Sequence, residues 1–188
     1  GIKMNSIIKP SLPTAALFLD ALDPQGKFTF HTFDDDESRK DKKLVRVLHG
    51  TSDKHATTLT TINQKGAGIF VTVNQTNLKG RKANDIEKVR AAFVDLDGSP
   101  LEPVLEHPLE PHIIVESSPS RWHAYWLCEL PCEEFSAVQL GLAEKFNGDT
   151  SVHDLPRVMR LPGFYHLKCG VGRTLKPFQT RIEQIRED

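Results

Sequence analysis

The chain has 188 residues, 38% of them hydrophobic and 26% charged, and its formal net charge is −1. This composition excludes a disordered chain, and the net charge gives no overall argument for nucleic acid binding. The longest apolar runs, such as 16–19 and 113–115, are far too short to span a bilayer, so we expect no membrane association.

The N-terminal half of the chain predicts two helices, two strands and a polar loop. Residues 28–33 alternate between apolar and polar side chains, which is typical of a half-buried strand. Ser52 is the predicted N-cap of the second helix. In chain order we expect a helix over 13–22, strands over 28–33 and 68–74 with a helix over 53–64 between them, and a loop over 77–84 that carries Lys79, Arg81 and Lys82.

The C-terminal half predicts a central strand, a hairpin and a helix. Residues 89–96 are apolar on both faces, as in a strand at the centre of a sheet. Residues 112–116 and 122–128 flank the turn-like segment 117–120 and predict a hairpin, and 133–146 predict an amphipathic helix. This order indicates an α+β fold with a mixed or antiparallel central sheet and flanking helices.

Cysteine usage and the start of the chain bear on where the protein works. The three cysteines (Cys128, Cys132 and Cys169) are odd in number and scattered, which favours the reducing cytoplasm over a disulfide scaffold. Cys128 ends an apolar run, so a core position is favoured over a zinc site. No signal peptide is apparent, and Gly1 to Lys3, ahead of Met4, resemble a remnant of expression.

Two acidic residues end the predicted central strand. Asp95 and Asp97 are two positions apart, so period-two geometry places both side chains on one face. Two such carboxylates repel each other unless a cation lies between them, and oxygen ligands suit Mg²⁺ or Mn²⁺. The alternative is a polar Asp-x-Asp-Gly turn after a core strand. A third acid, Asp149 or Asp154, follows the last predicted helix and favours the metal site.

Charged residues outside this pair are unevenly distributed. Residues 34–37 are all acidic and a mixed basic run follows at 39–43, which is usually just a solvated face. The C-terminal part is basic, with no acid until Glu183, and favours phosphate contact. From Arg157 onward, the basic residues of this stretch include Arg157, Arg160, Lys168, Arg173 and Lys176.

The acidic motifs resemble those of haloacid-dehalogenase-like phosphatases. Asp95-Leu96-Asp97-Gly98-Ser99 matches the first motif of that family, and Gly148-Asp149 with Asp154 resembles a later one. This resemblance implies a Mg²⁺-dependent phosphatase with Asp95 as the covalent nucleophile. However, about half of the chain precedes a motif that normally opens such a domain, and no lysine-bearing strand lies between the two motifs.

The segment from Gly66 to Lys168 resembles the archaeo-eukaryotic primase superfamily, in particular the RepB-type primase-polymerases of plasmids and phages. Asp95 and Asp97 match its first motif, and Ser120-Arg121-Trp122-His123 loosely matches its Ser-x-His element, with one extra residue. In its third motif an Asp precedes Arg-Leu by eleven positions, as Asp149 precedes Arg160. The Arg160-Leu161-Pro162-Gly163 block completes the likeness.

The primase resemblance implies a DNA primase-polymerase with an RNA-recognition-like catalytic core and an N-terminal α/β unit. It would transfer nucleotides from NTPs or dNTPs on a single-stranded DNA template, with Mg²⁺ or Mn²⁺ held by Asp95, Asp97 and Asp149. Because the serine motif departs from the family pattern, Ser117 or Ser118 could replace Ser120. The implied nucleotide-binding residues are Ser118, Ser120, His123, Arg157, Arg160 and Lys168.

The same resemblance implies the domain organisation and the partners. We expect one catalytic domain over 4–188, with an N-terminal lobe over about 4–88 and a catalytic lobe over about 89–188. The chain would be a fragment of a larger replication protein that works with a fused or separate helicase. A third hypothesis is a non-catalytic nucleic-acid-binding module, but such sheets present aromatic and basic residues where this chain has Asp95 and Asp97.

Overall fold

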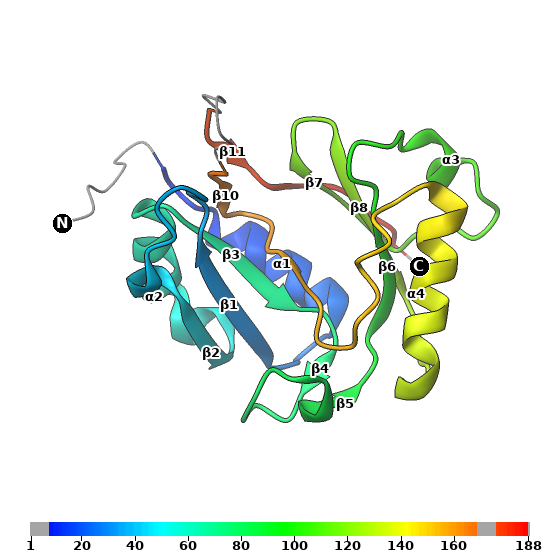
Figure 1. Cartoon of the computed structure of the whole chain (residues 1–188), viewed down its shortest axis with the longest axis horizontal. Coiled ribbons are helices and arrows are strands. Elements are labelled where there is room, and N and C mark those ends of the chain that lie inside the picture. The colour runs from blue at the N-terminus through cyan, green and yellow to red at the C-terminus, as the bar shows by residue number, and fades with distance from the viewer. Residues whose placement is uncertain (1–7, 169–175, 188) are drawn as a thin grey trace.

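The structure is a computed structural model that describes residues 8–168 and 176–187. The expected remnant at Gly1 to Lys3, Cys169 and Arg173 lie outside these residues. In the described part, two four-stranded sheets lie on either side of helix α1 (Figure 1). The elements are α1 (Leu12–Leu22), β1 (Phe28–Asp34), η1 (Lys42–Leu44), β2 (Arg46–Gly50), α2 (Ser52–Gln64), β3 (Ala67–Thr72), β4 (Gln75–Thr76), η2 (Ala83–Asp85), β5 (Ile86–Lys88), β6 (Ala91–Asp95), α3 (Glu102–Leu105), β7 (Ile113–Ser118), β8 (Arg121–Leu127), α4 (Cys132–Phe146), β9 (Val158–Arg160), β10 (Tyr165–His166), β11 (Phe178–Gln179) and β12 (Arg181–Ile185).

The first sheet has the strand order β2-β1-β3-β9, and its neighbours pair antiparallel. Phe30 on β1 pairs with Val71 on β3, which in turn pairs with Met159 on β9. These side chains share one face of the sheet because directly paired residues point the same way. They are fully buried against α1 and α2. β9 comes from the C-terminal half of the chain, so the polypeptide returns to this sheet after building the second one.

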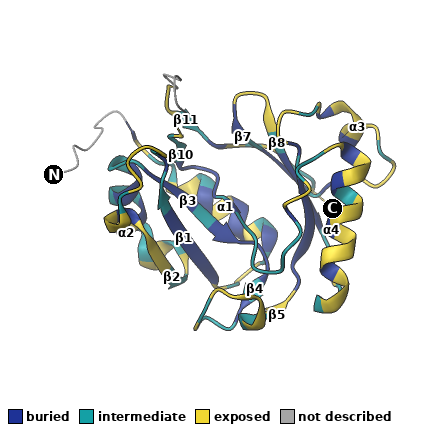
Figure 2. Ribbon diagram, in the orientation of Figure 1, coloured by how far each residue is buried: buried dark blue, intermediate teal, exposed yellow. Residues whose placement is uncertain are grey.

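The second sheet has the order β12-β7-β8-β6 and is also antiparallel. Its face toward α1 carries Phe93 and Tyr125, whose ring lies 5.3 Å from that of Phe18 on α1. The opposite face packs under α3 and α4, where Trp126 stacks on Phe146 at 5.8 Å. Figure 2 shows that the inner strands of both sheets are largely buried, whereas the edge strands β2 and β12 and the outer faces of the helices are more exposed. The α1 side chains therefore join both sheets in one core.

Several predicted features differ from the structure. β6 was expected at the centre of the sheet but lies at the edge of the second sheet, and it is apolar on both faces because α4 covers the face away from α1. β1 is buried from Phe28 to Thr32 instead of half-buried, because β4 and a cluster of rings cover the face away from the core. The cap of α2 is Thr51, whose side chain accepts the Lys54 N–H, and not Ser52. The predicted hairpin and the helices near 13–22 and 133–146 are present, and α3 forms unexpectedly in the proline-rich connector.

No helix in the described ranges is long and apolar enough to cross a membrane.

Candidate active site

A pocket of about 780 Å³ opens between the two sheets. The first sheet contributes Phe70 and the β9 residues Val158 to Arg160. The second sheet and its loops contribute acidic, basic and serine side chains. Of the nine predicted site residues, six line this pocket, and they are Asp95, Asp97, Ser118, His123, Arg160 and Lys168. Asp149, Arg157 and Ser120 do not line it.

Asp95 and Asp97 reach the pocket through a turn and not through the strand periodicity that we expected. β6 ends at Asp95, and Asp97 has a left-handed backbone with φ of 47°. The Asp97 N–H donates to Asp95 Oδ1 at 3.0 Å, which is the hydrogen bond of an Asx turn. Arg121 Nη1 contacts Asp97 Oδ1 at 2.7 Å. The turn keeps both carboxylates at the pocket although only one of them belongs to the strand.

His123 lies directly opposite Asp95 on the neighbouring strand β8. Its Nε2 is 3.6 Å from Asp95 Oδ1, its side chain is 5% exposed, and its Nδ1 has no hydrogen-bond partner within the described residues. Burial lowers the pKa of His123, Asp95 opposes this, and the charge of Arg160 adds to it, so the ring is neutral at pH 7. The ordinary alternative for a histidine on a buried strand is a core position with both ring nitrogens hydrogen-bonded. His123 differs from this, because its Nδ1 has no such bond within the described residues.

Asp149 approaches Asp95 through its backbone and not through its carboxylate. The Asp149 N–H donates to the Asp95 carbonyl oxygen at 2.8 Å. The carboxylate accepts from the backbone and the hydroxyl of Ser151, and these bonds, together with the charge of Arg157, lower its pKa despite partial burial. Within the described part of the chain, no three acidic, histidine or cysteine side chains converge as a metal site would require.

Gly148 permits this close approach. A Cβ at position 148 would lie 2.6 Å from Val94 Cγ2 and 2.7 Å from the Asp95 carbonyl oxygen. Non-bonded carbon and oxygen atoms do not approach so closely, so only glycine lets the chain run this near to β6. The loop that carries Asp149 is therefore held against the strand that carries Asp95.

Arg160 is held by a carboxylate from the other end of the chain. Its two terminal nitrogens contact the two oxygens of Asp35 at 2.8 and 2.9 Å, and its guanidinium carbon lies 4.7 Å from the Phe70 ring centroid. Asp35 is 5% exposed and also accepts the Leu167 N–H at 2.9 Å. The bidentate contact uses two of the five N–H donors of the guanidinium and leaves the others for a ligand.

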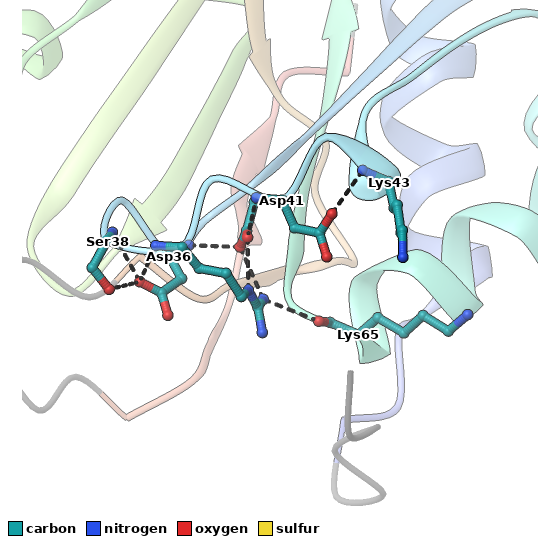
Figure 3. A network of polar contacts seen from close by, with 7 residues as sticks. Asp36, Ser38, Asp41, Lys43 and Lys65 are labelled. Carbon is teal, nitrogen blue, oxygen red and sulfur yellow. Dashed lines mark hydrogen bonds and ion pairs between the residues drawn. The ribbon is translucent and has the colours of Figure 1, made fainter. Parts of the chain in front are cut away.

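The segment 34–41 holds Asp35 and Glu37 beside the pocket. Asp34 accepts bonds from the Arg39 side chain and from the backbone N–H of Asp36 and of Asp41. Burial alone would raise the pKa of Asp34, but these donors outweigh it and lower the pKa. Figure 3 shows the surrounding contacts of Asp36, Ser38, Asp41, Lys43 and Lys65. Glu37 then contacts Lys168 Nζ at 3.0 Å.

The remaining predicted residues lie at the rim or behind it. Arg157 donates to Asp154 Oδ1 at 2.7 Å and contacts the Ser151 carbonyl oxygen, so its charge serves the loop that carries Asp149. Ser120 has a left-handed backbone in the hairpin turn, where its N–H donates to Glu116. Ser118 and Ser117 line the pocket instead.

The sequence reasoning missed two groups at the pocket. Asp35 and Glu37 belong to the acidic run 34–37, which resembled a solvated face, although its four consecutive acids after a strand were the available signal. His166 lines the pocket within the basic C-terminal stretch, and burial together with Arg160 lowers its pKa to about 4.

Residues 37–176 match the family model described as the RepB DNA-primase N-terminal domain, which is well over half of the chain. The chain therefore belongs to this family and to the archaeo-eukaryotic primase superfamily expected from its motifs. The match also leaves the phosphatase alternative without support. Among proteins of curated function, no sequence matches this chain.

Solved structures share the fold at low sequence identity. Primase RepB′ has a TM-score of 0.69 and 17% identity over 93% of this chain and 56% of that chain. The AEP domain of the cyanophage S-2L primase-polymerase gives 0.70 and 17% over 94% and 91%. The catalytic domain of RepB′ in complex with initiator DNA gives 0.66 and 15% over 94% and 86%. These likenesses confirm the mixed α+β fold, and the chain spans about half of the RepB′ primase.

Proposed function

We propose that the chain is the catalytic domain of a DNA primase-polymerase, which transfers nucleotides from NTPs or dNTPs on a single-stranded DNA template. One observation carries the proposal. Asp95 and Asp97 share a pocket with His123, Arg160 and Lys168, so two carboxylates face cationic and hydrogen-bonding groups across a space of about 780 Å³. Phosphoryl transfer needs this combination, because a metal ion and fixed cations must stabilise the charge that develops on the triphosphate.

The residues fit a divalent cation through the chemistry of their donors. We propose that Asp95 and Asp97 hold Mg²⁺ or Mn²⁺, since hard cations of this kind take oxygen ligands. Such an ion neutralises the triphosphate and lowers the pKa of an attacking hydroxyl. Arg121 Nη1 contacts Asp97 Oδ1 at 2.7 Å and orients this carboxylate at the pocket. Asp149 would complete the site, and for this its side chain would have to leave the hydroxyl of Ser151.

The same pocket offers several contacts to a triphosphate. The unused donors of Arg160 are available for phosphate oxygens, and His123 lines the same pocket. Lys168 adds a point charge, and Ser118 a hydroxyl, because both residues line the pocket. We assign Ser120 and Arg157 to supporting roles, Ser120 in the hairpin turn and Arg157 in the loop that carries Asp149.

We also propose that the chain divides into an N-terminal α/β lobe (about 4–88) and a catalytic lobe (about 89–188). Strand β9 belongs to the catalytic lobe in sequence but pairs with β3 of the N-terminal lobe. Because the chain spans 56% of the RepB′ primase chain, the remaining length of a full protein would supply further domains. A fused or separate helicase is the partner that we expect, since priming needs single-stranded template.

The decisive experiment is incorporation of labelled nucleotides on primed and unprimed single-stranded DNA with Mn²⁺ or Mg²⁺. We expect products longer than a dinucleotide from the native protein and none from Asp95→Ala or Asp97→Ala. Asp20→Ala, which removes an exposed acid on α1, is the matched control and should retain full incorporation.

Two outcomes would overturn the proposal. Native protein that binds DNA but extends no strand with either metal would be a non-catalytic binding module. Hydrolysis of an aryl phosphate with trapping of a phosphoryl mimic on Asp95 would restore the phosphatase alternative. Stability measured without metal should stay level or rise in Asp97→Asn, because this change relieves the repulsion between the two carboxylates and asparagine tolerates the left-handed backbone at position 97.

A further inference from the structure

A cluster of rings occupies the face of the first sheet that points away from its helices. The ring centroids of His31 and Phe33 are 4.0 Å apart, and those of Phe33 and Phe70 are 5.5 Å apart. His31 and Phe70 are directly paired across β1 and β3, so both lie on this face, opposite the core residues Phe30 and Val71. We call His31, Phe33 and Phe70 the aromatic patch.

The aromatic patch is continuous with the candidate active site on one side. Phe70 pairs with Arg160 of β9, whose guanidinium lies 4.7 Å above the Phe70 ring, and both residues line the pocket. The rings of Phe33 and Phe70 are only half-buried. Two benzyl side chains thus remain partly exposed next to the pocket, although burying them in the core would stabilise the fold more.

A basic loop borders the aromatic patch on another side. Residues 77–84 follow β4, which is tied to β1 by the hydrogen bond between Thr29 Oγ1 and Thr76 Oγ1 at 2.7 Å. The loop carries the exposed cations Lys79, Arg81 and Lys82. Arg81 is close enough to His31 that its charge adds to burial in lowering the pKa of that imidazole.

Three acids near this surface already pair with cations. Asp35 contacts Arg160, Glu37 contacts Lys168, and Asp34 contacts Arg39. Asp85, directly after the basic loop, accepts the Lys82 N–H and the Asn77 side chain and offsets one of the three cations of the loop. The surface therefore combines exposed rings with a surplus of positive charge, which matches an unpaired polynucleotide, whose bases stack on rings and whose phosphates attract cations.

We propose that single-stranded DNA template crosses the aromatic patch on its way to the pocket, with a base stacked on Phe33 beside Phe70 and phosphates against the loop 77–84. This inference rests on the proposed function and names the surface that its template uses. Because ring faces carry no hydrogen-bond donors or acceptors, the contact is tolerant of base sequence. Duplex DNA should bind weakly here, since its bases stack on one another.

The test is fluorescence anisotropy of a labelled oligothymidylate, without nucleotide or metal. Phe33→Leu keeps an apolar side chain against Phe70 but removes the ring, and we expect affinity to fall about tenfold at an unchanged salt dependence. Trp122→Leu is the matched control, because Trp122 is likewise a half-buried ring but lies on the second sheet, beside Arg181. Its affinity should equal that of the native protein.

The basic loop gives a second readout. Arg81→Gln with Lys82→Gln should lower the slope of log affinity against log salt by about 0.7 for each lost phosphate contact. Lys54→Gln with Lys145→Gln removes the same charge from the exposed surfaces of α2 and α4 and should leave the slope unchanged.

Native affinity in Phe33→Leu, equal losses in Phe33→Leu and Trp122→Leu, or equal competition by duplex DNA would overturn this inference. If one of these outcomes is found and the native protein still incorporates nucleotides, the proposed function stands and only the DNA-binding surface is misassigned. If the patch variants lose DNA binding as expected while the native protein extends no strand, the surface stands and the proposed catalysis fails.

Discussion

Asp35 and Arg160 are 125 positions apart in the chain and make two parallel contacts of 2.8 and 2.9 Å. Their side chains are 5% and 12% exposed. The free-energy cost of removing both charges from water offsets most of their attraction, so a buried pair of this kind adds little to the stability of the fold. Its main effect is to fix the orientation of the guanidinium. Asp35 is therefore a positioning residue for Arg160 at the pocket.

This relationship predicts coupled mutants. Asp35→Asn should destabilise the protein by about 1–3 kcal/mol, because it leaves the Arg160 charge buried with a weaker partner. The side-chain oxygen of asparagine can still accept the Leu167 N–H, so the loss of stability reports on the charge pair and not on this hydrogen bond. Adding Arg160→Met should recover most of the loss in urea denaturation at pH 7. Simple addition of the two single-mutant losses would show that the residues are not coupled. The KM for nucleotide should rise in Asp35→Asn with a smaller change in kcat.

The contact of Gly148 with β6 makes a second prediction. Gly148→Ala should cost about 1–3 kcal/mol of stability and reduce incorporation, because its Cβ would meet Val94 and the Asp95 carbonyl oxygen. Gly141→Ala, in the middle of α4, is the control, since no atom lies within 4 Å of its added Cβ. That variant should gain about 0.5–1 kcal/mol from the better helix propensity of alanine. Thermal denaturation and primer extension measure both effects, and equal stability of the two variants would contradict the close approach.

The third metal ligand is tested by two isosteric changes. Asp149→Asn should lower turnover by about 10²-fold, as expected for the loss of one strong electrostatic contribution to the transition state. Asp154→Asn should act mainly on the KM for nucleotide, through a loosened Arg157. Binding of Mn²⁺, followed by electron paramagnetic resonance, should weaken only in the first variant. If Asp154→Asn loses metal binding while Asp149→Asn still polymerises, the third ligand is misassigned.

Buried imidazoles predict acid sensitivity. Burial and the charge of Arg81 lower the pKa of His31 to about 4, and burial with the charges of Arg160 and Lys168, partly opposed by Asp35, lowers that of His166 to about 4. The ordinary pKa in the unfolded chain is about 6.5, so between these values the unfolded chain binds more protons. Stability should therefore fall as the pH drops from about 6.5 toward 4. The melting temperature of His31→Gln should depend less steeply on pH over this range, and a profile parallel to that of the native protein would exclude His31 as a contributor.

Local patterns in the sequence predicted local structure well. The β7–β8 hairpin and the helices near 13–22 and 133–146 follow from periodicity and turn residues within a few positions. Asp95 and His123, which the sequence singled out at a strand end and in a motif, lie opposite each other in the structure, and their roles stay a prediction. The pairing of Asp35 with Arg160 was not predictable, since nothing in a pattern of neighbours specifies which carboxylate meets a cation 125 positions away. The left-handed turn at Asp97 likewise depends on the hydrogen bond to Asp95 and not on strand periodicity.

The return of β9 to the first sheet has a consequence for dissecting the protein. β9 pairs with β3 from Phe70 to Thr72, so a fragment that ends near residue 88 would leave that edge of β3 without its hydrogen-bond partner. Unprotected edge strands recruit other chains and promote aggregation. Cleavage between the proposed lobes should therefore yield halves that stay associated or precipitate. Limited proteolysis followed by gel filtration would show whether the two pieces migrate as one particle.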